Sequence, residues 1–233
     1  MKYRKYKLLI PLSFVLLGFS AMLEGDNKLG SQKYDDFQTP EYCKQCHGAF
    51  YRQWEQAMMS EAYTHYWDEI EYFELAVKHS ENDPAMKDAH KGCNGCHTPI
   101  AYLAGDVPPP RPDKNSRANE SVSCEVCHNI KGIAGDTAYN FNYIMDAGKT
   151  KYSSRKGEIQ SPNHEIKKAD FYKTAKFCGI CHNEKSPFGV WVKSTQLEWE
   201  QGPYSKEGVQ CQDCHMPKAD MKTASMGARY QDA

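Results

Sequence analysis

The strongest helical pattern in the sequence lies in residues 61–79. Apolar side chains recur there at spacings of three and four residues, at Tyr63, Tyr66, Trp67, Ile70, Phe73 and Val77. This spacing predicts an amphipathic helix over residues 61–79, with its apolar face toward the interior. Asp83-Pro84 ends this helix and can start another short one.

The rest of the chain has weaker patterning. Residues 187–201 are a second, weaker helical candidate, and the run Val107-Pro-Pro-Pro-Arg-Pro112 must be extended. Residues 129–163 are rich in Gly, Asn, Ser and Tyr, and no alternating strand pattern stands out. We therefore expect a mainly α fold with long loops and little or no β-sheet.

The N-terminus has the pattern of an export signal. Basic residues up to Lys7 precede an apolar run from Leu8 to Leu23, and Gly18 and Ser20 suit cleavage after residue 20. The alternative is an uncleaved membrane anchor, but the run is short for a span of about 20 residues. We expect residues 1–20 to be a signal peptide and the mature protein to be periplasmic, with an extracellular or cell-surface location as the alternative.

Charge and composition narrow the picture further. Removing residues 1–20 takes away four basic residues and no acid, so the formal charge of −1 becomes −5. An acidic protein gives no support to nucleic acid as a partner. The mean hydropathy of −0.76 leaves little apolar material for a core. Something other than side chains must fill the interior.

The spacing of the cysteines indicates which group occupies the interior. Ten cysteines form five pairs, Cys43/Cys46, Cys93/Cys96, Cys124/Cys127, Cys178/Cys181 and Cys211/Cys214. Each pair is followed at once by a histidine, at His47, His97, His128, His182 and His215. Cys-x-x-Cys-His is the sequence sign of covalent haem attachment, with the histidine as proximal iron ligand. Disulfides or zinc knuckles are alternatives, but neither explains the five histidines. We therefore expect five haems c, whose macrocycles supply the core.

Four further histidines are candidates for distal iron ligands: His65, His79, His90 and His164. His90 precedes Cys93 by three residues and could instead contact a haem propionate. Five irons with two strong-field ligands each would need five distal partners, so one iron is expected to take another ligand or none.

An internal repeat orders the motifs. His79 precedes Cys93 by the same fourteen residues that separate His164 from Cys178. The segment from Trp54 to Ser60 also matches that from Trp199 to Ser205, and each tryptophan is expected near the end of a helix. We expect one haem-packed domain over residues 21–233, with a first haem segment (21–60) and two two-haem units (about 61–150 and 151–233).

The first motif, with Trp54 seven residues after its histidine, resembles the cytochrome c554 family. The run Cys211-Gln-Asp-Cys214-His215-Met216-Pro217 is similar to that wider group as well. The resemblance implies a distal position five residues after the tryptophan, where this chain has Met59, and four haems rather than five. Met59 is therefore a candidate fifth distal ligand. An open site remains the alternative, as do the other methionines Met58, Met86, Met145, Met216, Met221 and Met226.

Three functions fit these features. The first is an electron carrier without catalytic residues of its own, exchanging electrons with a quinol oxidase, a terminal reductase or an extracellular acceptor. The second is an oxidoreductase with one open-site haem acting on a small nitrogen or sulfur compound, in which Tyr204 or Lys206 could move protons. The third is a homo-oligomeric extracellular filament whose fifth distal histidine comes from the next subunit. Membrane association is expected only if the N-terminal segment is uncleaved.

Overall fold

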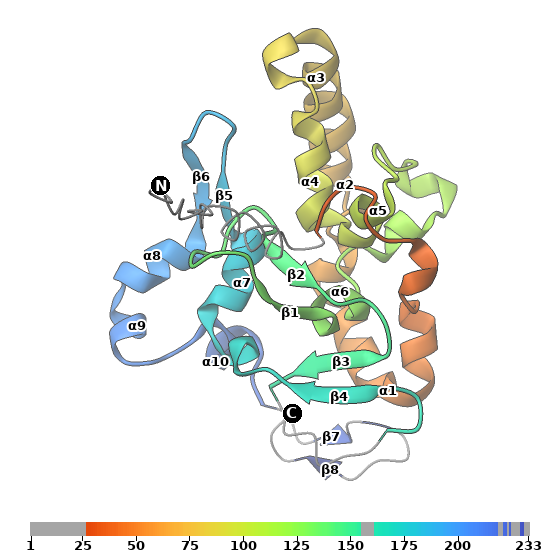
Figure 1. The fold of residues 1–233 in the computed structure, drawn as a ribbon, viewed down its shortest axis with the longest axis vertical. Coiled ribbons are helices and arrows are strands. Elements are labelled where there is room, and N and C mark those ends of the chain that lie inside the picture. The colour runs from red at the N-terminus through yellow and green to blue at the C-terminus, as the bar shows by residue number, and fades with distance from the viewer. Residues whose placement is uncertain (1–26, 155–160, 219–220, 223, 225–228, 231–233) are drawn as a thin grey trace, which may run out of the picture.

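The computed structural model describes residues 27–154, 161–218, 221–222, 224 and 229–230. The predicted signal peptide, residues 1–20, lies outside them. Short helices are joined by long connections, and the strands form small two-stranded sheets (Figure 1). The predicted class, mainly α with little β-sheet, is confirmed.

The helices of the N-terminal half begin with α1, where Tyr42 N–H donates to Thr39 Oγ1 at the N-terminus and Pro40 takes the first helical position. The α-helices of this half are α1 (Pro40–Glu55), α2 (Tyr66–Glu69), α3 (Lys78–Asn82), α4 (Ala89–His97), α5 (Pro99–Ala104) and α6 (Cys124–His128). Single 3-10 turns link them: η1 (Tyr34–Asp36), η2 (Met58–Glu61), η4 (Pro84–Met86), η5 (Pro112–Lys114) and η6 (Arg117–Glu120).

The helix predicted over residues 61–79 is present but shifted. It runs from Tyr66 to Asn82, through α2, the π-helical η3 (Ile70–Val77) and α3, and projects from the body as an arm (Figure 1). Asp83 ends it as predicted, and the Asp83 carboxylate accepts from Ala85 N–H at 2.9 Å to start η4. Two residues of the apolar pattern, Tyr66 and Trp67, are not covered by other protein side chains, since they are 67% and 64% exposed.

Strands were underestimated from the sequence. The structure contains β1 (Ile130–Ile133), β2 (Tyr143–Met145), β3 (Thr150–Ser153), β4 (Glu165–Lys168), β5 (Asn183–Lys185), β6 (Trp191–Ser194), β7 (Met221–Lys222) and β8 (Arg229–Tyr230). They pair as β1/β2, β5/β6 and β7/β8 antiparallel, and β3/β4 parallel. Strands of two to four residues are too short for alternation to be visible in a sequence.

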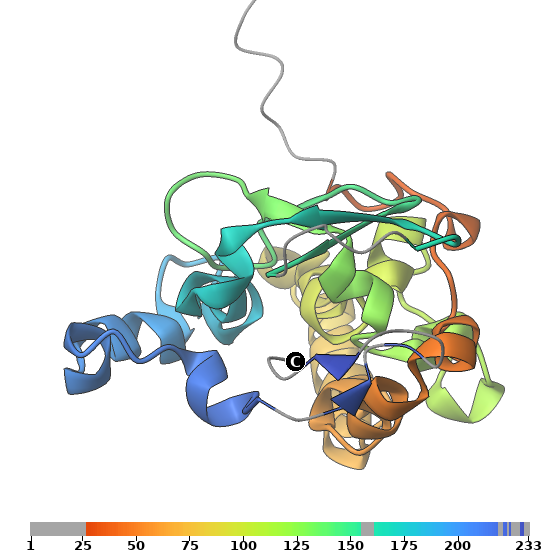
Figure 2. The same cartoon turned by 90° about the horizontal axis from the view of Figure 1, so that it is seen from below.

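The C-terminal half holds η7 (Asp170–Lys173), α7 (Ala175–His182), α8 (Thr195–Gln201), α9 (Pro203–Lys206) and α10 (Cys211–His215). The helix predicted over residues 187–201 is therefore correct only in its second half, because β6 occupies residues 191–194. Seen from below, the blue C-terminal helices and the orange α1 lie on opposite sides of the molecule, with green and teal strands across one face (Figure 2).

The protein core is small. One cluster of buried apolar side chains includes Ile100, Leu103, Tyr143 and Ile180, and a second includes Tyr63 and Tyr72. Large apolar side chains such as Met58, Leu75, Phe188, Val190 and Val192 are instead mostly exposed. This distribution agrees with an interior that side chains alone do not fill.

Candidate functional site

Each of the five Cys-x-x-Cys-His motifs lies in a helix that stops or kinks at the histidine. Helices α4, α6, α7 and α10 end at His97, His128, His182 and His215. In α1 the helix is kinked at His47, which has non-helical backbone angles. One helical turn places both thiols on one side of the backbone, as attachment of one macrocycle requires.

The ten cysteines predicted to hold haems are all free thiols in the structure, so the disulfide alternative has no support. Cys214 is exposed, and the other nine are half-buried: Cys43, Cys46, Cys93, Cys96, Cys124, Cys127, Cys178, Cys181 and Cys211. In the described part of the chain, no three His, Cys, Asp or Glu side chains converge to hold a metal ion, so the zinc alternative has no site there. The donor set therefore fits haem attachment.

Two of the histidines predicted to be proximal ligands have ring nitrogens held by backbone carbonyls. His97 Nδ1 lies 2.6 Å from Ala62 O, and His128 Nδ1 lies 2.8 Å from Tyr152 O. A carbonyl can only accept, so Nδ1 carries the proton in both rings and Nε2 keeps its lone pair. Metal-binding histidines are usually oriented in this way. The two rings are thus prepared to bind iron through Nε2.

Burial keeps two of these imidazoles neutral. Loss of solvent lowers the pKa of His128 and of His182 below the ordinary value. A neutral ring is the form that binds iron, since protonation would occupy Nε2.

The third motif contains a buried charge pair that the sequence did not reveal. Glu125, between the two cysteines, is 3% exposed, and Lys151 Nζ on β3 donates to its Oε2 at 2.8 Å. Asn129 Nδ2 also donates to this oxygen at 2.7 Å, and its own oxygen accepts from Lys151. The carbonyl of Tyr152, on the same strand, accepts from His128. Strand β3 therefore contacts the third motif at both Glu125 and His128. The charged residue inside the motif was the available sequence signal.

The thiols of the first motif have unlike neighbours. Cys43 lies beside Cys124, where α1 contacts α6, so the first motif meets the third there. Cys46, three residues later in α1, takes no part in this pair and directly precedes the kink at His47. The structure therefore leaves the predicted attachment role of Cys46 resting on its place in the motif.

The motifs adjoin one another in an order that differs from the sequence. The second and fourth meet at Cys96 and Cys181, and the fourth and fifth at Cys178 and Cys211. The third motif reaches the fourth through Tyr172, whose hydroxyl donates to Cys127 O and whose ring stacks on Phe177, next to Cys178, with centroids 4.5 Å apart. Together with the meeting of the first and third, these contacts connect all five motifs through near neighbours.

One predicted distal histidine lies opposite a proximal one. The His164 and His47 ring centroids are 6.1 Å apart, with their planes inclined by 36°. Metal–imidazole bonds of about 2.0 Å would place two axial rings roughly 6 Å apart between centroids. The separation therefore fits one iron between the rings.

The other three predicted distal histidines differ in their surroundings. His65 Nδ1 lies 3.5 Å from Asp68, whose other carboxylate oxygen is 3.3 Å from His97 Nδ1. Burial lowers the pKa of His90, and its Nδ1 is buried without a partner. The side chain of His79 is 65% exposed near the end of the arm, with Asp83 at 3.8 Å. His79 and His164, at matched sequence positions, thus have unlike environments.

Met59 belongs to a hydrogen-bonded arrangement that occurs twice. Trp54 Nε1 donates to Val122 O at 2.9 Å, and Val122 N–H donates back to Met59 O at 3.0 Å. The same two bonds, with the same two distances, join Trp199 to Val209 and Val209 to Tyr204. Each valine stands two residues before the first cysteine of its motif, the third or the fifth. We call this arrangement the tryptophan clamp.

The clamp explains the sequence match between Trp54–Ser60 and Trp199–Ser205. The serine at the end of each match caps the preceding turn, since Ser60 Oγ donates to Ala57 O and Ser205 Oγ to Gly202 O. Met59, 42% exposed, and Tyr204, 60% exposed, thus occupy equivalent backbone positions. The expectation that each tryptophan ends a helix is correct for Trp54, near the end of α1, and for Trp199, near the end of α8.

Comparisons with known proteins agree with this geometry. Residues 42–129 match the family described as cytochrome c554 and c-prime. The fold is similar to the crystal structure of a penta-heme cytochrome c552 from Thermochromatium tepidum, with a TM-score of 0.57 and 20% sequence identity. That match covers 85% of this chain, which spans 57% of the other. No curated protein matches the sequence significantly. Within the described residues, no helix has the length and apolar character needed to cross a membrane.

Proposed function

We propose that this chain, which resembles the cytochrome c554 family over residues 42–129, is an exported multihaem electron carrier with five covalently bound haems c. The observation that carries the proposal is the closeness of the motifs to one another. The first adjoins the third, the third approaches the fourth through Tyr172, and the fourth adjoins both the second and the fifth. Five haems attached in this order would form one connected relay.

The residues of each motif have distinct roles in this proposal. The two cysteines would hold the haem through thioether bonds, and the histidine would bind its iron through Nε2. The haem, when bound, supplies a one-electron iron couple. The chain orients the proximal rings, excludes water and provides the second ligand. His164 is the proposed distal ligand of the haem at His47, because of their 6.1 Å ring separation.

Met59 remains our proposed fifth distal ligand, since the tryptophan clamp fixes its backbone beside the third motif. His65, His79 and His90 remain proposed for other irons. The predicted signal peptide supports a periplasmic location. Partners would then be a quinol oxidase, a terminal reductase or an extracellular acceptor, and the acidic mature chain favours a basic or neutral docking surface.

Haem content and ligation test the proposal together. A pyridine haemochrome assay should give five haems per chain, and replacing Cys211 and Cys214 by Ser should give four. When a reductant is mixed rapidly with the unaltered protein, all five haems should become reduced, because electrons pass from each haem to its neighbours. Fewer than five haems, or a haem that is never reduced through the others, would contradict the proposal.

A second candidate, a self-assembling filament subunit, is favoured by the exposure of His79 on the projecting arm (Figure 1). In such an assembly His79 would bind an iron of the next copy. The number of bis-histidine irons, counted by EPR, should then fall on dilution and in a His79→Ala variant. A count unchanged by dilution would exclude this candidate.

A further inference from the structure

The haems of the second and third motifs would meet different charges behind their proximal ligands. Both histidines donate Nδ1–H to a carbonyl, from Ala62 for His97 and from Tyr152 for His128. Only His97 also has a carboxylate at this nitrogen, since Asp68 Oδ1 lies 3.3 Å away. An anion at Nδ1–H makes an imidazole a stronger donor to its metal.

Asp68 has no strong cation to neutralise it among the contacts that the structure gives. Its side chain is 25% exposed, and its ion-pair partners are the imidazoles of His97 and His65. A proximal ring bound to iron carries no proton at Nε2, and the same holds for His65 if it binds an iron. The negative charge of Asp68 is then not neutralised. Because Asp68 is partly buried, solvent and salt screen its interaction with the nearby haem only weakly.

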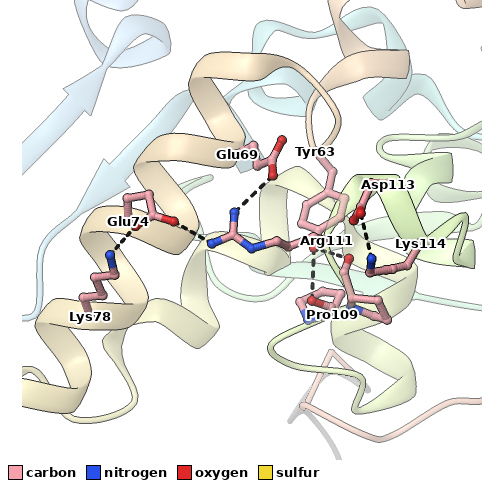
Figure 3. Close-up of polar contacts among 9 residues, drawn as sticks. Tyr63, Glu69, Glu74, Lys78, Pro109, Arg111, Asp113 and Lys114 are labelled. Carbon is pink, nitrogen blue, oxygen red and sulfur yellow. Dashed lines mark hydrogen bonds and ion pairs between the residues drawn. The ribbon is translucent and has the colours of Figure 1, made fainter.

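The carboxylate is also held in position. Asp68 lies in α2, and the next residue, Glu69, accepts from Arg111 at 3.1 Å (Figure 3). The other end of the Arg111 fork donates to Glu74 at 2.5 Å, and its guanidinium lies over the Phe73 ring at 4.4 Å. The arm is thereby tied to the polyproline segment at two successive turns. Asp68 therefore keeps its place beside His97.

The third motif has an acid as well, but its charge is compensated. Glu125 is paired with Lys151 at 2.8 Å, so this motif carries no net charge from the pair. A negative charge beside a haem stabilises the oxidised iron and so lowers its reduction potential. Motifs two and three therefore differ by one uncompensated anion at the proximal ligand.

We propose that Asp68 sets the reduction potential of the haem held by Cys93, Cys96 and His97, keeping it below that of the haem held at His128. This inference rests on the proposed attachment of haems at these motifs. Within the relay, the second motif would then be a site of lower potential than the third.

The test is Asp68→Asn in the five-haem protein, with each haem followed through stepwise reduction by paramagnetic NMR. The reduction equilibrium constant of the second haem should rise about tenfold, equal to about 59 mV for one electron, while the other four stay in place. Asp68→Glu should keep the low potential. Glu71→Gln, at an exposed acid on the same arm, is the matched control and should change nothing at the second haem.

Two outcomes would overturn the inference: an unshifted second haem in Asp68→Asn, or an equal shift in Glu71→Gln. If the Asp68→Asn variant does not fold with its haems attached, the reduction potential of the second haem is measured in Asp68→Ser instead, with the same expected shift. The unaltered protein gives an independent reading, since a second haem at or above the potential of the third contradicts the proposal. Haem content distinguishes failure of the proposed function from failure of this inference. Fewer than five haems in the unaltered protein refutes the proposed function. Five haems with an unchanged potential in Asp68→Asn refutes only the role of Asp68.

Discussion

Replacing Lys151 by Met would remove one half of the buried charge pair in the third motif. Glu125 is 3% exposed and would keep only the amide of Asn129 as a close donor, at 2.7 Å. Breaking a buried ion pair by removing one partner typically costs about 3–5 kcal/mol, because the remaining charge is left without compensation. Lys151 is itself 15% exposed, so water can reach the vacated position and the lower end, about 3 kcal/mol, is expected.

Thermal unfolding of the whole protein, with its haems attached, measures this cost. For a domain of this size about 1 kcal/mol shifts Tm by about 2–4 °C, so Lys151→Met should lower Tm by about 6–12 °C. The double variant Glu125→Gln/Lys151→Met removes both charges and should recover most of the loss. Lys149→Met, at an exposed position two residues away, should shift Tm by no more than about 1 °C, as surface substitutions usually do.

Two results would refute this reasoning. One is a Lys151→Met variant as stable as the unaltered protein, which would mean that Glu125 is solvated or protonated without its partner. The other is a double variant no more stable than the single one. The loss would then come from packing of the lysine stem and not from the unpaired carboxylate.

Three further predictions concern contacts elsewhere. Trp54→Phe keeps the ring but loses the indole N–H bond of the clamp, and should cost about 1–2 kcal/mol in chemical denaturation; Trp199→Phe should cost a similar amount, and a large inequality would argue against equivalent clamps. His164→Ala should leave haem content at five while the EPR spectrum loses one bis-histidine iron, and an unchanged spectrum would exclude its proposed pairing. Arg111→Lys cannot bridge Glu69 and Glu74 as a fork, so the midpoint of chemical unfolding should fall at low salt and fall less at high salt; no salt dependence would contradict this.

The attachment motifs are the part of the site most accessible from sequence. A thiol pair and its histidine lie within one helical turn, so their arrangement is local, and all five helices stop or kink at the histidine as one motif would dictate. The helix of the arm was also foreseeable from its spacing. Its beginning at Tyr66 was not, because exposed Tyr66 and Trp67 belong to the apolar pattern without facing the protein core.

Contacts between residues far apart in the chain could not be predicted from the sequence, for a physical reason. The proximity of His164 to His47 depends on the path of the chain through three motifs, which local spacing does not encode. The matched position of His79 predicted a similar environment, yet its ion-pair neighbour comes from the arm itself. The backbone carbonyls of Ala62 and Tyr152 carry no side-chain signal at all, although they orient the two proximal rings.

The pairing of His47 with His164 also has a consequence for biogenesis. A chain exported from its N-terminus presents the first attachment motif first, but His164 emerges only after the third motif has followed. On the proposed ligation, the first haem would spend that interval bound on one face alone. Its coordination would be completed when the segment that carries His164 folds back onto the first motif. Binding of the second ligand to the first haem would then indicate that this later segment has folded.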